Sequence, residues 1–542
     1  MTQPALLPLH ALPSRLQIVT EDGSHETAFA PDGTVVVKDI AVHFDSATGR
    51  LQLHARTSRV KRLSLRWKTA DRDDLHRSVY LGDHWERSYG DLEWRGLRAE
   101  RVMPWYFLQH APDGRTHGYG VKVRPAAMCF WRVTHEELIL ACDVRCGGTG
   151  VDLRGRTLEV CTLVSREGQP DESAFAAAVA FTRLLCDDPL RLDHVAYGAN
   201  DWYYLYANNT RETVLRDTGT ISRLSPNAQN RPYSVIDSGW QKYGGPAAGG
   251  PWTPNAKFPD FEKLPAQMRG LGTRPGIWVR PSASGEPLLP GLQRAKIGGD
   301  STTRLLDLST DEVQADMDRT LHHLVNELGF DLVKHDFSSW DVFGLPGIHF
   351  HDRITSDGWA FADTSRTTAE ILVTHYRTIA RYADKATILA CNCPSHLTAG
   401  LCHINRTGGD TSGLNWERTR IQGVNTLAFR MPQHRALYEI DADCVGLTTK
   451  IPWEMNREWL FALAHSGTPL FVSLQPEAIG PDQESALREA LDIASRPLSM
   501  AEPIDWLTNV TPNHWHCHDG ERRFRWNGFE GEDFTTDVVL YQ

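Results

Sequence analysis

An ammonium group and a carboxylate stand two residues apart at the end of an apolar stretch. Lys334 and Asp336 follow Leu332 and Val333, and a Phe-Ser-Ser-Trp segment comes directly after them. Side chains two apart on a β-strand point to the same face, so both would project from the carboxyl end of one strand. In a parallel α/β barrel that end carries the chemistry. For so short a motif on its own, a strand-end ion pair without catalytic duty is the alternative interpretation.

A second carboxylate follows a later apolar run, in Arg406-Thr-Gly-Gly-Asp410. The two glycines let the backbone turn sharply and present the Asp410 carboxylate inward. Glycoside hydrolysis needs two such carboxylates, one to attack the sugar and one to protonate the leaving oxygen. We expect Lys334 to keep Asp336 ionised and nucleophilic. We expect a less polar wall to give Asp410 the raised pKa of a general acid.

Other polar and aromatic residues also stand where apolar runs stop. They are Trp202, Asp237, Trp278 and Asn392. Such groups bind sugar hydroxyls or stack on the apolar face of a sugar ring, although tryptophans are as often part of a core. The sequence therefore predicts a polar site at one edge of a sheet.

The elements that would position these residues begin near residue 190, where apolar runs alternate with helical runs. This alternation indicates βα units and a parallel sheet. Eight runs are predicted strands: residues 194–202, 233–240, 274–280, 330–340, 385–392, 401–406, 438–443 and 469–474. Eight strands in roughly 290 residues is the size of a (β/α)8 barrel. We predict an α/β catalytic domain of this kind, a (β/α)8 TIM barrel, over residues 186–480.

The remaining parts of the chain are predicted to be β-rich. Residues 1–185 alternate polar and apolar positions between Gly and Asp turns, which indicates an N-terminal antiparallel β-sandwich. Residues 481–542 hold one predicted helix, from Gln483 to Ser495, and strand-like pieces at 522–526 and 536–541. We predict a small C-terminal β unit there.

The composition of the chain limits the kinds of binding partner and the cellular compartment that we expect. The 542 residues carry a net charge of −11 without a basic stripe, which argues against nucleic acid or an anionic membrane as a partner. We see no secretory signal and no run of 18 apolar residues. The 10 cysteines are scattered, so we expect reduced, buried thiols in a cytoplasmic protein. We find no phosphate-binding glycine loop and no paired zinc ligands, and we expect no cofactor and no metal.

Five motifs, in order, resemble those of the α-galactosidase clan of retaining glycoside hydrolases, families 27 and 36. Residues 332–336 look like the nucleophile strand with its Lys-x-Asp, and residues 235–241 are similar to the Asp-Asp-Gly-Trp strand. Residues 276–281 resemble the third-strand Gly-Leu-Trp motif, and residues 391–394 resemble a cysteine-containing fifth-strand loop. Arg406 and Asp410 resemble the Arg-x-x-x-Asp motif of the acid/base. The resemblance covers most of residues 196–475, and the predicted sandwich looks more like family 36.

The resemblance implies roles for these residues. Asp336 would be the nucleophile and Asp410 the acid/base. The implied substrate-binding residues are Asp237, Lys334, Arg406, Trp202, Asn392, Trp278, Ser238 and Cys391. Ser238 stands where the family has the second aspartate of a pair that grips galactose, and Asn392 stands where family 27 has Glu. These two departures leave the identity of the sugar open.

The implied function is a retaining, exo-acting α-glycosidase that removes a terminal α-linked galactose or galactose-like sugar from an oligosaccharide or glycoside. A transglycosidase would use the same residues, and a relative in the clan could prefer N-acetylgalactosamine, arabinopyranose or glucose. A sugar-binding protein without activity and a Schiff-base lyase that uses Lys334 are further alternatives. Because family 36 enzymes often assemble, a homo-oligomer is also considered.

Overall fold

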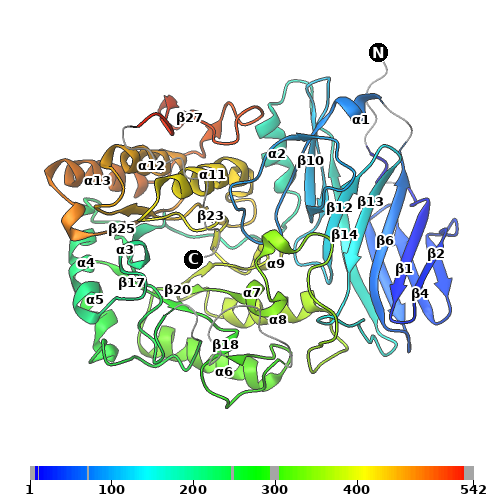
Figure 1. The fold of residues 1–542 in the computed structure, drawn as a ribbon, viewed down its shortest axis with the longest axis horizontal. Helices are drawn as coiled ribbons and strands as arrows, with labels where there is room; N and C mark the ends of the chain where they lie inside the picture. The colour runs from blue at the N-terminus through cyan, green and yellow to red at the C-terminus, as the bar shows by residue number, and fades with distance from the viewer. Residues whose placement is uncertain (1–6, 10, 70–72, 246–248, 293–303, 530–542) are drawn as a thin grey trace.

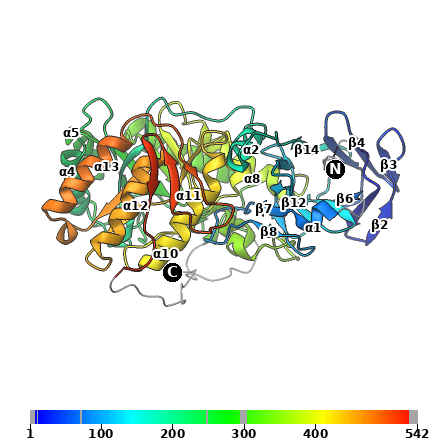
Figure 2. The same cartoon turned by 90° about the horizontal axis from the view of Figure 1, so that it is seen from above.

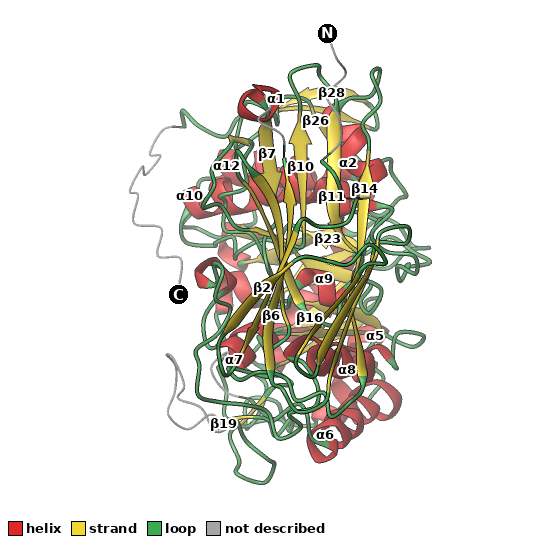
Figure 3. Ribbon diagram, turned by 90° about the vertical axis from the view of Figure 1, so that its right-hand side faces the viewer, coloured by secondary structure: helices red, strands yellow, loops and turns green. Residues whose placement is uncertain are grey.

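The computed structural model describes residues 7–9, 11–69, 73–245, 249–292 and 304–529. Figures 1 and 2 show an elongated molecule with antiparallel strands at one end and a helix-covered sheet at the other. Figure 3 views it from the N-terminal end, where the strands lie in front of the helices.

Two antiparallel sheets form the N-terminal part, as the alternating pattern predicts. The first has the order β2-β1-β6-β13-β12-β9. Its strands are β1 (Arg15–Thr20), β2 (Ser24–Thr27), β6 (Val60–Lys68), β9 (Met103–Pro104), β12 (Met128–Val133) and β13 (Glu137–Asp143). In β1, buried positions alternate with more exposed ones, which is the pattern of a strand with one face on a core.

The second N-terminal sheet has the order β3-β4-β5-β14-β11-β10-β7-β8. Its strands are β3 (Thr34–Val37), β4 (Ile40–Asp45), β5 (Arg50–Ala55), β7 (Val79–Gly82), β8 (Arg95–Gly96), β10 (Tyr106–His110), β11 (Thr116–Val121) and β14 (Thr157–Arg166). A short helix, α1 (Asp73–Arg77), precedes β7, and α2 (Ala174–Thr182) leads away from β14.

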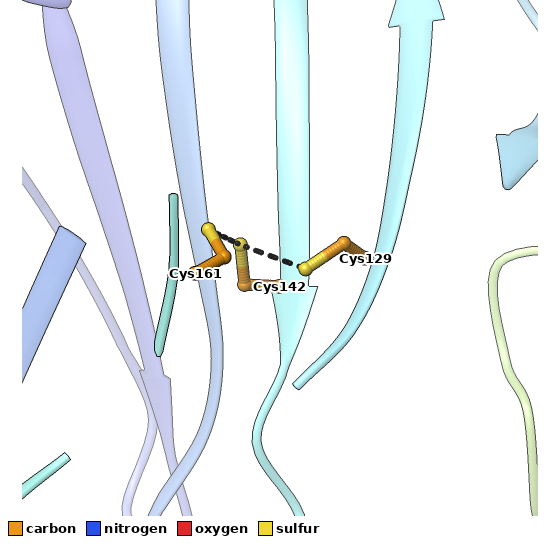
Figure 4. A group of neighbouring side chains, drawn as sticks. All are labelled: Cys129, Cys142 and Cys161. Atoms are coloured by element: carbon orange, nitrogen blue, oxygen red, sulfur yellow. Dashed lines mark hydrogen bonds between the residues drawn. The ribbon is translucent and has the colours of Figure 1, made fainter. Parts of the chain in front are cut away.

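Three cysteines lie where the two sheets meet (Figure 4). Cys129 and Cys142 face each other on β12 and β13, with their sulfur atoms 3.7 Å apart, and Cys161 of β14 lies 3.9 Å from Cys142. Structural zinc sites in proteins have four ligands, and this group offers three thiols, so we interpret it as core packing. All ten cysteines are free and buried, which confirms the expected state of the thiols.

A parallel sheet of nine strands forms the second part, in the order β23-β22-β21-β20-β17-β16-β15-β25-β24. The strands are β15 (Tyr197–Asn200), β16 (Tyr233–Ile236), β17 (Arg274–Val279), β20 (Leu332–His335), β21 (Thr387–Ala390), β22 (Ile404–Arg406), β23 (Glu439–Asp441), β24 (Val445–Leu447) and β25 (Leu470–Leu474). All eight predicted runs form strands of this sheet. A two-stranded pair, β18 (Ala283–Ser284) and β19 (Arg304–Leu305), lies outside it.

The count of nine rather than eight comes from the predicted seventh strand. The chain forms β23 there, leaves the strand conformation at residues 442–444, and forms a second short strand, β24, directly afterwards. Asp443 has a φ of +84°, which an extended strand cannot accommodate, so the strand is interrupted there. β23 pairs with β22, whereas β24 pairs with β25 at the other end of the order.

Helices alternate with these strands, as βα units require. They are α3 (Trp202–Leu205), α4 (Arg211–Leu224), α5 (Leu264–Gly270), α6 (Asp311–Leu321), α7 (Ser338–Phe343), α8 (Thr368–Ala380), α9 (Ser395–Thr398), α10 (Trp416–Arg418), α11 (Asn425–Arg430) and α12 (Trp453–Ser466). Capping boxes at Thr210 and Thr367 begin α4 and α8 by satisfying free backbone N–H groups. The predicted helix before β20 is α6, which continues as a π-helical turn to Glu327.

The C-terminal part contains α13 (Pro481–Ala494) and a small antiparallel sheet of β26 (Glu502–Pro503), β27 (His514–Cys517) and β28 (Gly520–Arg523). Helix α13 packs on α12 and α4 of the parallel-sheet part. The predicted strand at 536–541 lies outside the described residues, and the predicted domain limits at 185 and 480 stay predictions. Within the described chain, no helix combines the length and apolarity needed to cross a membrane.

Candidate active site

The carboxyl edge of the parallel sheet gathers the predicted site residues. Asp237 follows β16, Trp278 lies in β17, Asp336 follows β20, and Arg406 ends β22. The registers place neighbouring ends together, because Trp278 pairs with Lys334 and the Asp336 N–H donates to the carbonyl of Val279 at 3.0 Å. Parallel strands therefore bring residues that are far apart in the sequence to one edge.

Three N–H donors hold the Asp336 carboxylate. The indole Nε1 of Trp278 donates to Oδ2 at 3.0 Å, the amide of Asn392 donates to Oδ1 at 2.6 Å, and the backbone N–H of Phe337 donates to Oδ1 at 2.7 Å. Trp278 itself is buried. Its indole N–H therefore has Asp336 rather than water as its hydrogen-bond partner. Donors on both oxygens fix the orientation of this carboxylate.

Lys334 contacts a different carboxylate from the one that its spacing suggests. Its Nζ lies 2.7 Å from Oδ2 of Asp237, and both side chains are more than nine-tenths buried. Lys334 and Asp336 share a strand face, but the four-carbon side chain of lysine reaches across to the end of β16. Burial alone would lower the pKa of Lys334, but the combined effect of Asp237, Cys391 and Asp336 exceeds that of burial and holds the pKa above its ordinary value.

We expect Lys334→Met to destabilise the protein by about 3–5 kcal/mol, because it leaves the Asp237 carboxylate buried without a cation. Urea unfolding measures this loss. Lys242→Met is the matched control, since Lys242 pairs with Glu286 while half exposed, and it should change the midpoint little. Adding Asp237→Asn to Lys334→Met should recover part of the stability, and an undiminished loss in the double variant would contradict the ion-pair explanation.

Two guanidinium groups bind the Asp410 carboxylate. Arg406 Nη2 lies 2.6 Å from Oδ1, and Arg87 Nη1, from the N-terminal part, lies 3.0 Å from the same oxygen. Burial acts to raise the pKa of Asp410, but the cations around it, Arg406 and Arg87 first and then Arg418 and Lys334, hold the pKa well below its ordinary value. The expected raised pKa of a general acid is therefore wrong for Asp410 in this structure, because the wall around the carboxylate is cationic rather than apolar.

Arg406 also binds a second carboxylate, that of Asp443. Its Nη1 lies 2.7 Å from Oδ1 of Asp443, whose other oxygen, Oδ2, accepts hydrogen bonds from the hydroxyl of Tyr203 and the N–H of Thr411. Burial raises the pKa of the neighbouring Asp441 to about 6, against the opposing effect of Arg406. These contacts fix the guanidinium of Arg406 in the plane that reaches Asp410.

The two candidate catalytic carboxylates, Asp336 and Asp410, both affect the pKa of one neighbour, Cys391. The Cys391 thiol is buried, and burial together with Asp336 and Asp410 raises its pKa well above the usual value. Arg406 and Lys334 act on the same thiol in the opposite direction. Cys391 thus interacts electrostatically with all four charged groups.

The remaining predicted residues lie around this cluster. Trp202 begins α3 and is partly exposed, with its ring 5.5 Å from that of Tyr206 in an edge-to-face contact. This exposure leaves a ring face that a sugar can cover. Ser238 is buried, and its hydroxyl accepts a hydrogen bond from the amide of Gln241 at 3.3 Å. Asn392 has a left-handed backbone conformation, with φ +47°, and its side-chain amide donates to Asp336.

Sequence reasoning missed two contributors to the site. Asn200 donates to Asp237 Oδ2 at 2.8 Å, and Arg87 binds Asp410. Asn200 stands at the end of the first predicted strand, so its position was a usable signal. Arg87 carried no such signal, because it lies 323 positions before its partner in a segment without regular periodicity.

We expect Trp278→Phe to lower kcat by about 10–100-fold, because it removes one charge-assisted hydrogen bond to Asp336 while keeping an aromatic ring. Turnover of any cleaved glycoside measures this effect. Trp252→Phe is the matched control, since Trp252 packs edge-to-face on Trp278 at 5.9 Å. An equal loss in both variants would show that packing, and not the donor, matters.

Comparison with known proteins defines the class of fold. No protein-family model matches the chain, and no curated protein sequence matches it either. Solved structures do match. The α-galactosidase TtGalA from Thermus thermophilus, in complex with p-nitrophenyl α-D-galactopyranoside, aligns with a TM-score of 0.60 and 16% identity, covering 94% of this chain and 99% of that chain.

Two further structures extend the comparison. A single-substitution variant of the family GH36 α-galactosidase AgaA from Geobacillus stearothermophilus, in complex with 1-deoxygalactonojirimycin, aligns with a TM-score of 0.60 and 14% identity over 94% of this chain and 79% of that chain. A cycloalternan-degrading enzyme from Trueperella pyogenes aligns with a TM-score of 0.55 and 12% identity over 94% and 87%. The chain thus has the fold of family 36 α-galactosidases, which confirms the resemblance at the level of fold.

Proposed function

We propose that the protein is a retaining, exo-acting α-glycosidase whose nine strands close into a barrel behind an N-terminal β-sandwich. The observation that carries the proposal is the Asp336 carboxylate, oriented by three N–H donors at the carboxyl edge of the sheet. Asp410 stands in the same cluster and supplies the second carboxylate that glycoside hydrolysis requires. The fold shared with family 36 α-galactosidases supports this reaction class.

The proposed reaction has two displacements. Asp336 attacks the anomeric carbon and forms a covalent glycosyl ester, while Asp410 protonates the departing oxygen. Asp410, now a carboxylate, then takes a proton from the water that cleaves the ester. Both arginines contact Oδ1 of Asp410, so neither of these bonds occupies Oδ2, which we assign to proton transfer.

The proposed substrate carries a terminal α-linked galactose or galactose-like sugar. The buried pair of Lys334 and Asp237 forms a charged, hydrogen-bonding floor that fits the hydroxyl groups of one terminal sugar. Trp202 offers a partly exposed ring for the apolar face of that sugar. The ligands of the two α-galactosidase structures, a galactopyranoside and 1-deoxygalactonojirimycin, support galactose as the first choice.

A second candidate is a glycosidase or transglycosidase of the same fold with a different sugar. Ser238 is the observation that favours it, since its hydroxyl is buried against Gln241 where the family's paired aspartate would stand. The cycloalternan-degrading enzyme among the similar structures is consistent with this alternative.

The experiment that tests the proposal is hydrolysis of a panel of p-nitrophenyl α- and β-glycosides. The panel holds galactose, N-acetylgalactosamine, glucose, fucose and arabinose, with Asp336→Ala alongside the wild type. Cleavage of an α-galactoside, lost in the variant, supports the first candidate. Cleavage of another α-glycoside selects the second, and product analysis with added sugar acceptors separates hydrolysis from transfer. Cleavage of β-glycosides alone would overturn both.

A further inference from the structure

A loop of the N-terminal sheets reaches the candidate active site. This β7–β8 loop, residues 83–94, connects two strands of the second antiparallel sheet. Its Ser88 forms a short parallel bridge with Gly408: the Ser88 N–H donates to the carbonyl of Thr407 at 2.8 Å, and the Gly409 N–H donates to the carbonyl of Ser88 at 2.7 Å. The loop is therefore fastened to the turn that carries Asp410.

Arg87 is the residue of this loop that touches a candidate catalytic group. Its Nη1 lies 3.0 Å from Oδ1 of Asp410, and its side chain is 6% exposed. The guanidinium also lies 5.2 Å from the centre of the Tyr89 ring and 5.4 Å from that of Trp340. A planar cation in contact with two aromatic rings has little freedom to leave its partner.

Glu86, next to Arg87, anchors the loop on the other side. Its carboxylate is fully buried and accepts hydrogen bonds from the N–H of Gly347 at 2.8 Å and from the indole of Trp340 at 3.2 Å. It also accepts from the hydroxyls of Tyr89 and Ser339. Ser339 and Trp340 belong to α7, which begins two residues after Asp336. The same loop is therefore hydrogen-bonded to the helix that directly follows the proposed nucleophile.

We propose that Arg87 is a positioning residue that sets the proton affinity of Asp410, so that the N-terminal sheets tune the acid/base step of the catalytic site. The role of Arg87 in catalysis rests on the proposed function, in which Asp410 is the acid/base. Its effect on the pKa of Asp410 rests only on the contact between the two side chains. A salt bridge of this kind favours the ionised carboxylate.

Several charged and titratable groups face Asp410 from the elements around it. The cations are Arg87 of the β7–β8 loop, Arg406 of β22, Arg418 of α10 and Lys334 of β20. Tyr203, Tyr206 and Cys391 are neutral groups that also interact with it. Arg406 is shared with Asp443, whereas the carboxylate nearest to Arg87 is that of Asp410, so removing Arg87 changes the balance at Asp410 directly.

The sign of the effect follows from these charges. The first displacement needs Asp410 protonated, and Arg87 opposes protonation. Without Arg87 the pKa of Asp410 rises, the protonated fraction at a given pH increases, and the alkaline limb of the activity profile moves to higher pH. A single opposite charge in direct contact shifts a carboxyl pKa by about one unit or more.

The test compares the pH dependence of kcat/KM in wild type, Arg87→Met and Arg87→Lys, over a range that extends from pH 9 down to about pH 2 because the pKa of Asp410 lies well below its ordinary value. The substrate is the glycoside that the panel selects, with a poor leaving group. We expect the alkaline limb of Arg87→Met to move up by about one pH unit and that of Arg87→Lys by less, since lysine keeps the charge. Arg223→Met is the control, because Arg223 pairs with Glu484 on the surface. An unmoved limb in Arg87→Met would overturn the proposal.

A substrate-free arm separates this inference from the proposed function. Asp410, with its pKa lowered in the folded state, adds stability above the unfolded-state pKa that is lost as the pH falls through the folded pKa. At pH 7 we expect Asp410→Asn to lower the urea midpoint more in wild type than in Arg87→Met. Equal losses would overturn the inference. If the wild type cleaves no glycoside, the proposed function fails while this comparison still decides the role of Arg87.

Discussion

Asp336→Ala is expected to lower kcat on the selected α-glycoside by about 10⁴-fold or more, because it removes the nucleophile of the first displacement. The loss should appear without unfolding, since the methyl group leaves a small space beside Trp278 and Asn392. Steady-state kinetics and urea unfolding of the same preparation measure both effects.

A matched control lies at the opposite end of the same strand. Asp331 precedes β20 at the amino edge and pairs with Arg269. Asp331→Ala should keep wild-type turnover, because the chemistry lies at the carboxyl edge. Added azide should restore turnover in Asp336→Ala by occupying the vacated space, and it should give a β-glycosyl azide. Wild-type turnover in Asp336→Ala, or an unchanged rate with azide alongside an equal loss in Asp331→Ala, would contradict the assignment.

Asp410→Ala is expected to have an effect that depends on the leaving group. For a glycoside with a poor leaving group, kcat/KM should fall by about 10²–10⁴-fold, because protonation of the departing oxygen is lost. For a dinitrophenyl glycoside, which departs without a proton, kcat/KM should change little. The kcat on that substrate should still fall, since water attack on the glycosyl ester loses its base.

The comparison of the two substrates is its own control, because misfolding would lower both rates equally. Asn415→Ala, which removes the N-cap of α10 close to Asp410 in the sequence, serves as a second reference for local structural damage. An equal fall in kcat/KM on both leaving groups would contradict the role of Asp410 as the acid/base.

The strands of the parallel sheet could be predicted because each is a short apolar run that ends in a polar residue. The interruption of the seventh strand could not be predicted, since it depends on the positive φ of one non-glycine residue, Asp443. That conformation is sustained by long-range contacts, in which the Asp443 carboxylate binds Arg406 and Tyr203. The local sequence pattern therefore predicts that a strand forms, whereas tertiary contacts determine where that strand is interrupted.

The candidate site shows the same division. Spacing placed Lys334 and Asp336 on one strand face, but the reach of a lysine side chain decides its partner, which is Asp237. Spacing also brought Asp410 into the cluster. Its electrostatic state depends on Arg87, which enters from a different sheet, so no pattern near Asp410 could reveal it. Residue types and order predict which groups meet, and the long-range contacts between sheets decide how they titrate.

The most direct test of the central claim is covalent trapping of the proposed nucleophile. The wild type is incubated with a slow fluorinated α-glycoside of the sugar that the panel selects, and the intact chain and its peptides are weighed by mass spectrometry. The account predicts a mass increase of one glycosyl unit, located on Asp336 and absent from Asp336→Ala. An adduct on another residue, or hydrolysis that releases the β-configured sugar first and leaves no adduct, would contradict it.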